Sequence, residues 1–232
     1  TSREPRDIPR KDQPRPEDYL FDLDKALMSI VSVRSTIPED ALTARTLGPE
    51  RVGHGVVISE KGLVLTIGYL VTEAESVWLV DGHGRATAGY PLGFDQETGF
   101  GLIQALGSLD LPHLEFGDSE DLVKGDNVIL AGAGGRENAI KAQVTAKREF
   151  AGYWEYVLDE AIFTAPPHPT WGGAGLIGHD GKLLGIGSLF VQQVTGGDSM
   201  DCNMIVPIDL LKPILPELQK FGRVQKPARP WL

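Results

Sequence analysis

The sequence predicts an all-β fold, an antiparallel barrel or sandwich, on three observations. Short runs rich in Val, Ile and Leu recur between residues 52 and 207, among them VVIS, LVLTI, SVWLV, NVILAGA and LLGIGSLFV. Turn signals such as EKG, DGHG, KGDN and GHDGK separate these runs. No stretch of helical periodicity lies between them, which argues against alternating β and α units. We therefore expect many short strands joined by tight turns that contain glycine.

Length and composition bound the class of protein. The 232 residues suffice for one large all-β domain or two small ones. The 22 Lys and Arg residues against 32 Asp and Glu residues give a net charge of −10, which argues against general nucleic-acid binding. A single cysteine excludes a disulfide framework and an all-cysteine metal site. No run of 18 apolar residues is present, so we expect no membrane insertion by this sequence.

The N-terminal part of the chain changes character at residue 16. Residues 1–16 are rich in proline, which lacks the N–H that helices and central strands need. We expect an extended linker there, rich in Pro and Arg. Leu20, Leu23 and Leu27 then follow at helical spacing, with acidic residues just before them. We expect a short helix that runs into a strand at residues 30–35.

The C-terminal segment of residues 208–232 predicts a broken helix followed by an extended tail. Pro213 and Pro216 interrupt its apolar stripe, and each proline removes a helical N–H, so we expect a kink or a split. Gly222 is expected to end the helix, since glycine is common at helix C-termini. The stripe consists of Leu210, Leu211, Ile214, Leu215 and Leu218.

Five segments, in order, resemble the protease domain of the HtrA/Deg-type serine proteases, a bacterial branch of the trypsin-like fold. They are VGHGVVISEKGLVLTIGYLV at 52–71, YPLGFDQETGFGLIQAL at 90–106, LPHLEFGDSEDLVKGDNVILAGAG at 111–134, FTAPPHPTWGGAGLIGHDGKLLGIGSL at 163–189 and the run at 204–232. The third segment is the closest match, with Gly-Asp-Ser at 117–119. The resemblance covers most of residues 26–232.

The resemblance implies the architecture and its boundaries. It implies two six-stranded antiparallel β-barrels with short terminal helices, in a protease-fold domain at residues 17–207. The first barrel is expected at about residues 28–109 and the second at about 111–207. Residues 208–232 resemble the helix and linker that lead into a PDZ domain in this family.

The three triad positions of that family hold residues without the required chemistry. Triad catalysis needs a hydroxyl nucleophile, an imidazole base and a carboxylate that orients the imidazole. By the resemblance, Tyr69 stands at the histidine position, Gly99 at the aspartate position and Gly172 at the serine position. A tyrosine hydroxyl, with an ordinary pKa of about 10, is a poor general base at neutral pH, and glycine has no side chain. The loss of a triad lowers kcat by about 10⁶-fold, so we expect no ordinary peptidase turnover.

The oxyanion position is altered as well. Where the family has a glycine two residues before its serine, this chain has Thr170. A β-branched residue disfavours the positive φ angles that such loops often need, so we expect the loop at residues 166–175 to be reshaped. The loop contains no Ser or Cys, and Thr170 is its only hydroxyl. An active hydrolase that uses rearranged residues is the alternative function.

Other side chains are weaker candidates for a site. His54 and His168 fall near the expected cleft and could together bind a metal ion or a proton, but no HxH or HExxH spacing is present, and hydrogen-bonded loop histidines are the simpler interpretation. We expect Cys202 to be a small strand residue and not a nucleophile, and Trp78 to lie in the core. No cofactor is expected. A metal-binding or purely scaffolding domain is the third function considered.

The function implied by the resemblance is that of a pseudoprotease in bacterial envelope protein quality control. Such a domain would bind peptides or unfolded protein segments by adding them to a strand. The expected location is periplasmic or extracytoplasmic, with any tether in a segment outside this sequence. A homo-oligomer, a trimer by resemblance, is expected, with Tyr19 and Phe21 as candidate contacts. The expected peptide-binding residues are Trp171, Gly185, Ile186, Gly187, Ser188 and Leu189. Two alternatives stay open: Trp171 could fill the specificity pocket as a plug without a ligand, and Ser188 could have a structural role.

Overall fold

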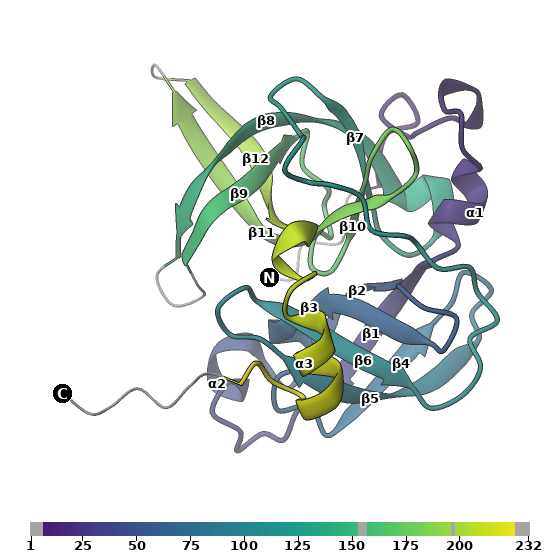
Figure 1. Ribbon diagram of the computed structural model, residues 1–232, viewed down its shortest axis with the longest axis vertical. Coiled ribbons are helices and arrows are strands. Elements are labelled where there is room, and N and C mark those ends of the chain that lie inside the picture. The colour runs from purple at the N-terminus through teal and green to yellow at the C-terminus, as the bar shows by residue number, and fades with distance from the viewer. Residues whose placement is uncertain (1–6, 153–156, 196–197, 226–232) are drawn as a thin grey trace.

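Two closed barrels, each of six antiparallel strands, form the body of the protein (Figure 1). The structure is a computed structural model that describes residues 7–152, 157–195 and 198–225. Short helices lie before the first barrel and after the second. The predicted all-β class, with two six-stranded barrels and short terminal helices, is confirmed.

The strands follow the chain, one barrel after the other. In the first barrel the strand order is β1-β2-β3-β6-β5-β4, and in the second it is β10-β11-β12-β9-β8-β7. The first barrel consists of β1 (Ile30–Thr36), β2 (Glu50–Val57), β3 (Leu63–Ile67), β4 (Ser76–Val80), β5 (Ala86–Phe94) and β6 (Phe100–Ala105). The second consists of β7 (Asn127–Ala131), β8 (Ala139–Ala151), β9 (Val157–Ala165), β10 (Gly175–Ile177), β11 (Leu183–Thr195) and β12 (Asp198–Pro207).

Strand β4 illustrates how alternation selects the core. Val77 and Leu79 are 2% and 1% exposed and belong to the apolar core, whereas Trp78 between them is 47% exposed. Successive side chains of a strand point to opposite faces, so one strand cannot bury all three on one side. The expectation that Trp78 lies in the core is therefore wrong, because its neighbours occupy the inward positions.

The predicted N-terminal helix is divided into two short pieces. A 3₁₀ turn, η1 (Pro16–Asp18), comes first, and the helix α1 (Leu23–Leu27) leads into β1. The Asp22 carboxylate accepts a hydrogen bond from the Lys25 N–H and so caps α1. Tyr19 and Phe21 pack partly buried against the core of the same chain. Three further short helices lie between the strands: α2 (Ala44–Leu47), η2 (Gly68–Leu70) and η3 (Gly135–Asn138).

Residues 7–16 pack against the second barrel, which differs from the extended linker expected for residues 1–16. Ile8 is 5% exposed and belongs to an apolar cluster of that barrel. The Lys141 N–H donates to the Asp12 carbonyl at 2.7 Å, which ties the segment to β8. One isoleucine among prolines and charges anchors the segment, since its burial contributes about 1.5–3 kcal/mol. Residues 1–6 lie outside the described part of the chain.

The C-terminal segment is split as the two prolines predict. It forms η4 (Ile208–Leu210) and, after a turn, α3 (Leu215–Phe221). Gly222 ends α3 with a φ of 69°, a left-handed angle that glycine adopts without strain. Its carbonyl accepts a hydrogen bond from the Phe94 N–H at 3.2 Å, so α3 returns to the first barrel, in front of which it lies in Figure 1. Residues 226–232, with the end of the expected junction, lie outside the described residues.

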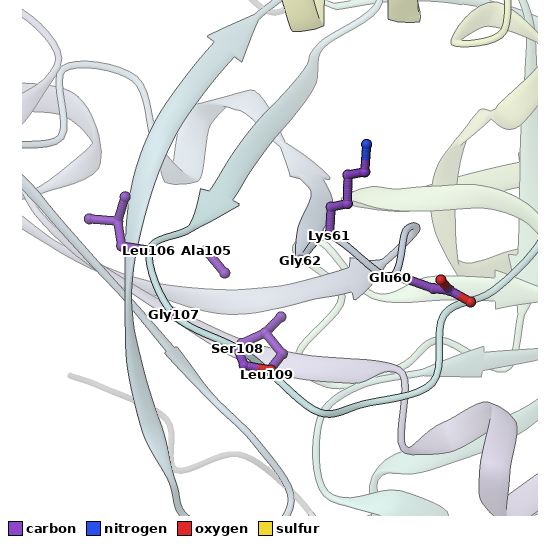
Figure 2. Close-up of a pocket in the computed structure, with 8 residues that line it drawn as sticks. All are labelled: Glu60, Lys61, Gly62, Ala105, Leu106, Gly107, Ser108 and Leu109. Atoms are coloured by element: carbon purple, nitrogen blue, oxygen red, sulfur yellow. The ribbon is translucent and has the colours of Figure 1, made fainter.

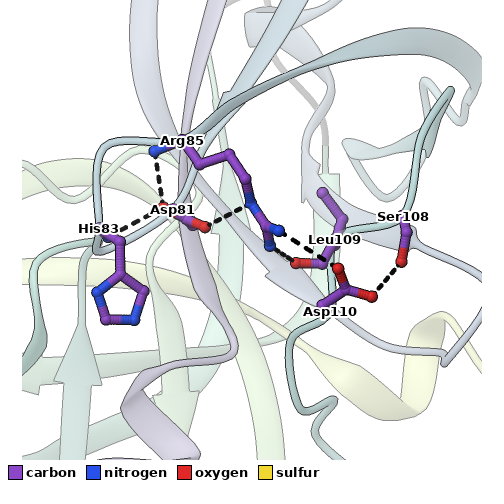
Figure 3. Close-up of polar contacts among 6 residues, drawn as sticks. All are labelled: Asp81, His83, Arg85, Ser108, Leu109 and Asp110. Carbon is purple, nitrogen blue, oxygen red and sulfur yellow. Dashed lines mark hydrogen bonds and ion pairs between the residues drawn. The ribbon is translucent and has the colours of Figure 1, made fainter.

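Polar contacts fix the segments that join the barrels. Asp209 in η4 accepts hydrogen bonds from the N–H and the hydroxyl of Ser119, both at 2.6 Å. Figure 3 shows Arg85 between Asp81, with which it pairs at 3.2 Å, and Asp110, with which it pairs at 3.3 Å. Arg85 thereby links the β4–β5 turn to the connection between the barrels. Within the described residues, no helix has the length and apolar character needed to cross a membrane.

Candidate functional site

The structure brings the three triad positions together between the barrels. Tyr69 lies in η2, directly after β3, while Gly99 precedes β6 and Gly172 lies in the loop between β9 and β10. The Gly68 N–H donates to the Gly99 carbonyl at 2.6 Å. A Cβ atom placed on Gly172 would lie 2.7 Å from the Tyr69 hydroxyl oxygen. The tyrosine hydroxyl therefore sits where a side chain at position 172 would begin.

Tyr69 uses its hydroxyl as a hydrogen-bond donor. Its Oη lies 2.8 Å from the Ser188 carbonyl oxygen on β11, and the hydroxyl donates to that carbonyl. The contact joins η2 of the first barrel to β11 of the second across 119 residues of sequence. This hydrogen bond joins the two barrels. The Tyr69 hydroxyl could not act as a catalytic base here, because Gly172 has no side chain that it could deprotonate.

Gly99 lies in a turn that suits glycine. Its φ is 83°, an angle that side chains other than those of Asn and Asp rarely adopt. Its N–H donates to the Asp95 carbonyl at 2.9 Å, and the Asp95 carboxylate accepts hydrogen bonds from the N–H and hydroxyl of Thr98. Asp95 is thus committed to the turn and is not available to replace a carboxylate at position 99.

The loop at residues 166–175 is held against β2 by main-chain contacts. The His54 N–H donates to the Gly172 carbonyl at 2.8 Å. Gly173 has a φ of 80°, and a Cβ atom there would lie 1.9 Å from the His54 carbonyl oxygen. Position 173 therefore tolerates only glycine. Thr170 is not among the described residues with a positive φ, which agrees with the preference of a β-branched residue.

Two buried histidines, His54 and His168, and the half-buried Thr170 form a polar cluster at this loop. His54 Nε2 lies 3.0 Å from the Thr170 hydroxyl oxygen. The Thr170 N–H donates to His168 Nδ1 at 3.1 Å, and His168 Nε2 lies 3.0 Å from the Asn138 carbonyl oxygen. The imidazole rings of the two histidines meet edge to face, with centroids 5.9 Å apart.

The hydrogen bonds assign the tautomers of both histidines. His54 Nδ1 accepts from the Ala133 N–H at 3.1 Å, so the proton of the neutral ring is on Nε2 and is donated to Thr170. His168 Nδ1 accepts from the Thr170 N–H, so its proton is likewise on Nε2 and is donated to the Asn138 carbonyl. Because His54 presents an N–H to the hydroxyl, this tautomer cannot take the proton of Thr170.

Burial keeps both histidines neutral. His54 is 7% exposed and His168 is fully buried. Desolvation, with a smaller contribution from the charge of His168, lowers the pKa of His54 to about 4, and desolvation also lowers the pKa of His168. Each ring nitrogen of this pair thus has a protein partner. No group of three or more His, Cys, Asp or Glu side chains suited to a metal ion occurs among the described residues.

The residues expected to bind peptide differ in accessibility. Gly185 and Ile186 pair with β10 on one side and β12 on the other. Gly187 donates to the Ala174 carbonyl at 2.7 Å and accepts from the Gly173 N–H at 2.9 Å. These three residues therefore offer no open strand edge to a peptide, because neighbouring segments of the chain already pair with them.

Beyond Gly187 the surroundings of β11 change. The Ser188 side chain is fully buried, and its carbonyl accepts from Tyr69. From Leu189 onward β11 pairs with β12, and no second strand pairs with it within the described residues. Trp171 packs on Phe190, with ring centroids 5.6 Å apart. Phe190 is not among the residues that the sequence predicts to bind peptide, although it is an aromatic residue two positions after Ser188.

The remaining candidates lie away from this site. Cys202 is buried in β12, and burial raises the pKa of its thiol, which opposes formation of the thiolate. His83 and His179 are exposed. Figure 2 shows a pocket of about 310 Å³ between residues 60–62 and 105–109 of the first barrel, and it contains none of the triad positions.

Comparisons with known proteins agree with this architecture. A family model described as trypsin-like peptidase domain matches residues 53–186. A probable periplasmic serine endoprotease, DegP-like, of Pseudomonas putida (strain W619) is 29% identical over 189 residues, which is 79% of this chain and 37% of that protein. The periplasmic pH-dependent serine endoprotease DegQ of Escherichia coli (strain K12) is 25% identical over 223 residues, 88% of this chain and 49% of that protein.

Solved structures share the fold. The HtrA-type protease AlgW with a tripeptide has a TM-score of 0.68 at 20% identity, over 86% of this chain and 63% of that chain. AlgW with a decapeptide has a TM-score of 0.66 at 19% identity, over 87% and 67%. The chain spans less than half the length of the two curated relatives. The family match, the relatives and the double barrel together place this chain in the trypsin-like peptidase family, as an HtrA-type domain.

Proposed function

We propose that this HtrA-type domain binds extended peptide segments without hydrolysing them. The observation that carries the proposal is the arrangement at the three triad positions, where the Tyr69 hydroxyl occupies the space above Gly172 and is bonded to the Ser188 carbonyl. A nucleophile, a base and an orienting carboxylate are the minimum for this type of acyl transfer. Tyr69, Gly99 and Gly172 supply none of these three functions.

The edge of β11 from Leu189 onward, beside which the described residues place no second strand, supports the binding half of the proposal. An extended segment gains main-chain hydrogen bonds when it adds to such an edge, and side-chain contacts add selectivity. The Trp171 and Phe190 rings lie beside this edge and would contact apolar side chains of the segment. The structures of AlgW with a tripeptide and a decapeptide support peptide binding on this fold.

The setting of the proposed function follows from the relatives. The DegP-like and DegQ proteins are named as periplasmic, and we propose the same location and a part in envelope protein quality control. A trimer and a following PDZ domain are further proposals, and both rest on the family resemblance of the sequence. The ligands proposed are peptides and unfolded protein segments, with no cofactor and no nucleic acid.

A hydrolase with rearranged residues is the second candidate function. The specific observation in its favour is the 3.0 Å contact between the Thr170 hydroxyl and His54 Nε2. The hydrogen bond from the Ala133 N–H to Nδ1 opposes it, because it leaves the proton on the nitrogen that faces the hydroxyl. If this pair were catalytic, casein cleavage would disappear in both Thr170→Val and His54→Asn variants.

Binding of a permanently unfolded protein tests the proposal directly. Fluorescence anisotropy of labelled casein should rise on titration with the domain, and the casein should be recovered intact. The Phe190→Ser variant removes the exposed aromatic ring and should weaken binding by about tenfold. Tyr90→Ser removes an aromatic ring that is 57% exposed on the first barrel and serves as the matched control. Equal affinity of all three proteins would count against the β11 edge as the binding site.

A further inference from the structure

On the side of β11 that faces the first barrel, one main-chain carbonyl already accepts a hydrogen bond from a side chain. The Ser188 carbonyl is directed at η2, where the Tyr69 hydroxyl donates to it at 2.8 Å. The register between β11 and β12 shifts between Gly187 and Leu189, so Ser188 is the extra residue of a bulge. This bulge lies at the point where the pairing of β11 with β10 ends.

Alternation along the strand identifies the next main-chain groups on the same edge. In an extended strand, residues two apart direct their N–H and C=O groups to the same side. Gly187, opposite Ile205, directs its N–H and C=O away from β12, to Ala174 and Gly173. Because Ser188 is the extra residue of the bulge, the alternation resumes with Leu189 opposite Met204, so residues 190 and 192 again direct these groups away from β12. No second strand pairs with residues 190 and 192 in the described part of the chain. An added peptide strand would find its hydrogen-bond partners at these residues.

We propose that Tyr69 is a positioning residue that excludes an added peptide from Ser188 and confines it to the outer part of β11, from Phe190 onward. This inference rests on the proposed peptide binding. The hydroxyl satisfies the carbonyl that a peptide N–H would otherwise reach, and it lies 2.7 Å from the point where a side chain at position 172 would begin. A bound segment thus begins beside the Trp171 and Phe190 rings and stays clear of the space between the barrels.

The Tyr69→Phe variant tests this role, because it removes only the hydroxyl and keeps the ring. The probe is a fluorescein-labelled, end-blocked octapeptide of alternating Val and Thr, which favours an extended strand. Tyr69→Phe should bind this probe about 2- to 10-fold more tightly than the unmodified protein, since one further main-chain hydrogen bond becomes available. Tyr90→Phe, an exposed tyrosine of β5, should leave the affinity unchanged.

A set of probes with a single N-methylated amide counts the main-chain hydrogen bonds. Each methyl group that removes a required N–H should weaken binding, and Tyr69→Phe should show one more sensitive amide than the unmodified protein. Equal counts and equal affinities, with clear binding by both proteins, would overturn the role of Tyr69 while leaving peptide binding in place. Failure of the unmodified protein to bind casein or any probe would instead refute the proposed function, and the role of Tyr69 with it.

Discussion

The buried histidine pair makes a quantitative prediction about stability and pH. His54 keeps its ring neutral because burial lowers its pKa to about 4, whereas an unfolded histidine has a pKa of about 6.5. The folded state therefore binds this proton less readily than the unfolded state, so the contribution of His54 is fully present above pH 6.5 and is lost as the pH falls toward 4. Linkage between these two pKa values gives a loss of about 2 kcal/mol from pH 7 to pH 5 and about 3 kcal/mol by pH 4.

Urea unfolding at a series of pH values measures this loss. The matched variant is His54→Asn, whose side-chain oxygen can still accept from the Ala133 N–H but does not titrate. The free energy of unfolding of the unmodified protein should fall about 2 kcal/mol more than that of His54→Asn between pH 7 and pH 5. His83→Asn, at an exposed histidine, should behave like the unmodified protein. Parallel curves for the unmodified protein and His54→Asn would refute the buried, neutral assignment.

Three further predictions concern the glycines of the site. Gly173→Ala should destabilise the fold by about 3 kcal/mol or more in urea unfolding, because its φ is 80° and the new methyl group would overlap the His54 carbonyl; a change below 0.5 kcal/mol would contradict the loop geometry. Gly172→Ser should lower the free energy of unfolding by about 1–3 kcal/mol, and by less in a Tyr69→Phe background. A double-mutant cycle of these two substitutions that shows no coupling would argue against the contact between positions 69 and 172. The triple variant Tyr69→His, Gly99→Asp, Gly172→Ser should not cleave casein, since the loop that carries position 172 stays bound to the His54 N–H and does not place a serine for attack; efficient cleavage would refute this geometry of the loop.

Most of the fold could be predicted from the sequence, because the signals for strands, turns and helix ends are local. Alternating apolar runs and glycine-containing turns predict the strands, and two prolines predict the division of η4 from α3. Where two signals competed, the prediction was wrong or incomplete. Trp78 is a large aromatic residue of the kind that often lies in a core, but its position between two inward-facing side chains places it on the exposed face of β4. Ile8 lies among prolines and charges, yet one apolar side chain suffices to anchor its segment.

The site could be predicted only as a set of absences. The resemblance identified Tyr69, Gly99 and Gly172 as the residues at the triad positions. Their side chains alone show that they are unsuited to triad catalysis. What Tyr69 does instead depends on a contact with Ser188, 119 positions away, which no local pattern encodes. The tautomers of His54 and His168 also depend on main-chain groups from distant segments, at Ala133 and at Asn138. Contacts of this kind become visible only when the two barrels are packed together.

The most direct test of the account is whether the protein hydrolyses peptide bonds at all. Casein incubated with a high concentration of the purified domain would be examined by mass spectrometry, alongside Thr170→Val and Cys202→Ala variants purified in the same way. We expect intact casein in every sample, or a trace of fragments equal in all three that marks a contaminating protease. Fragments formed by the unmodified protein and abolished by Thr170→Val or by Cys202→Ala would contradict this expectation.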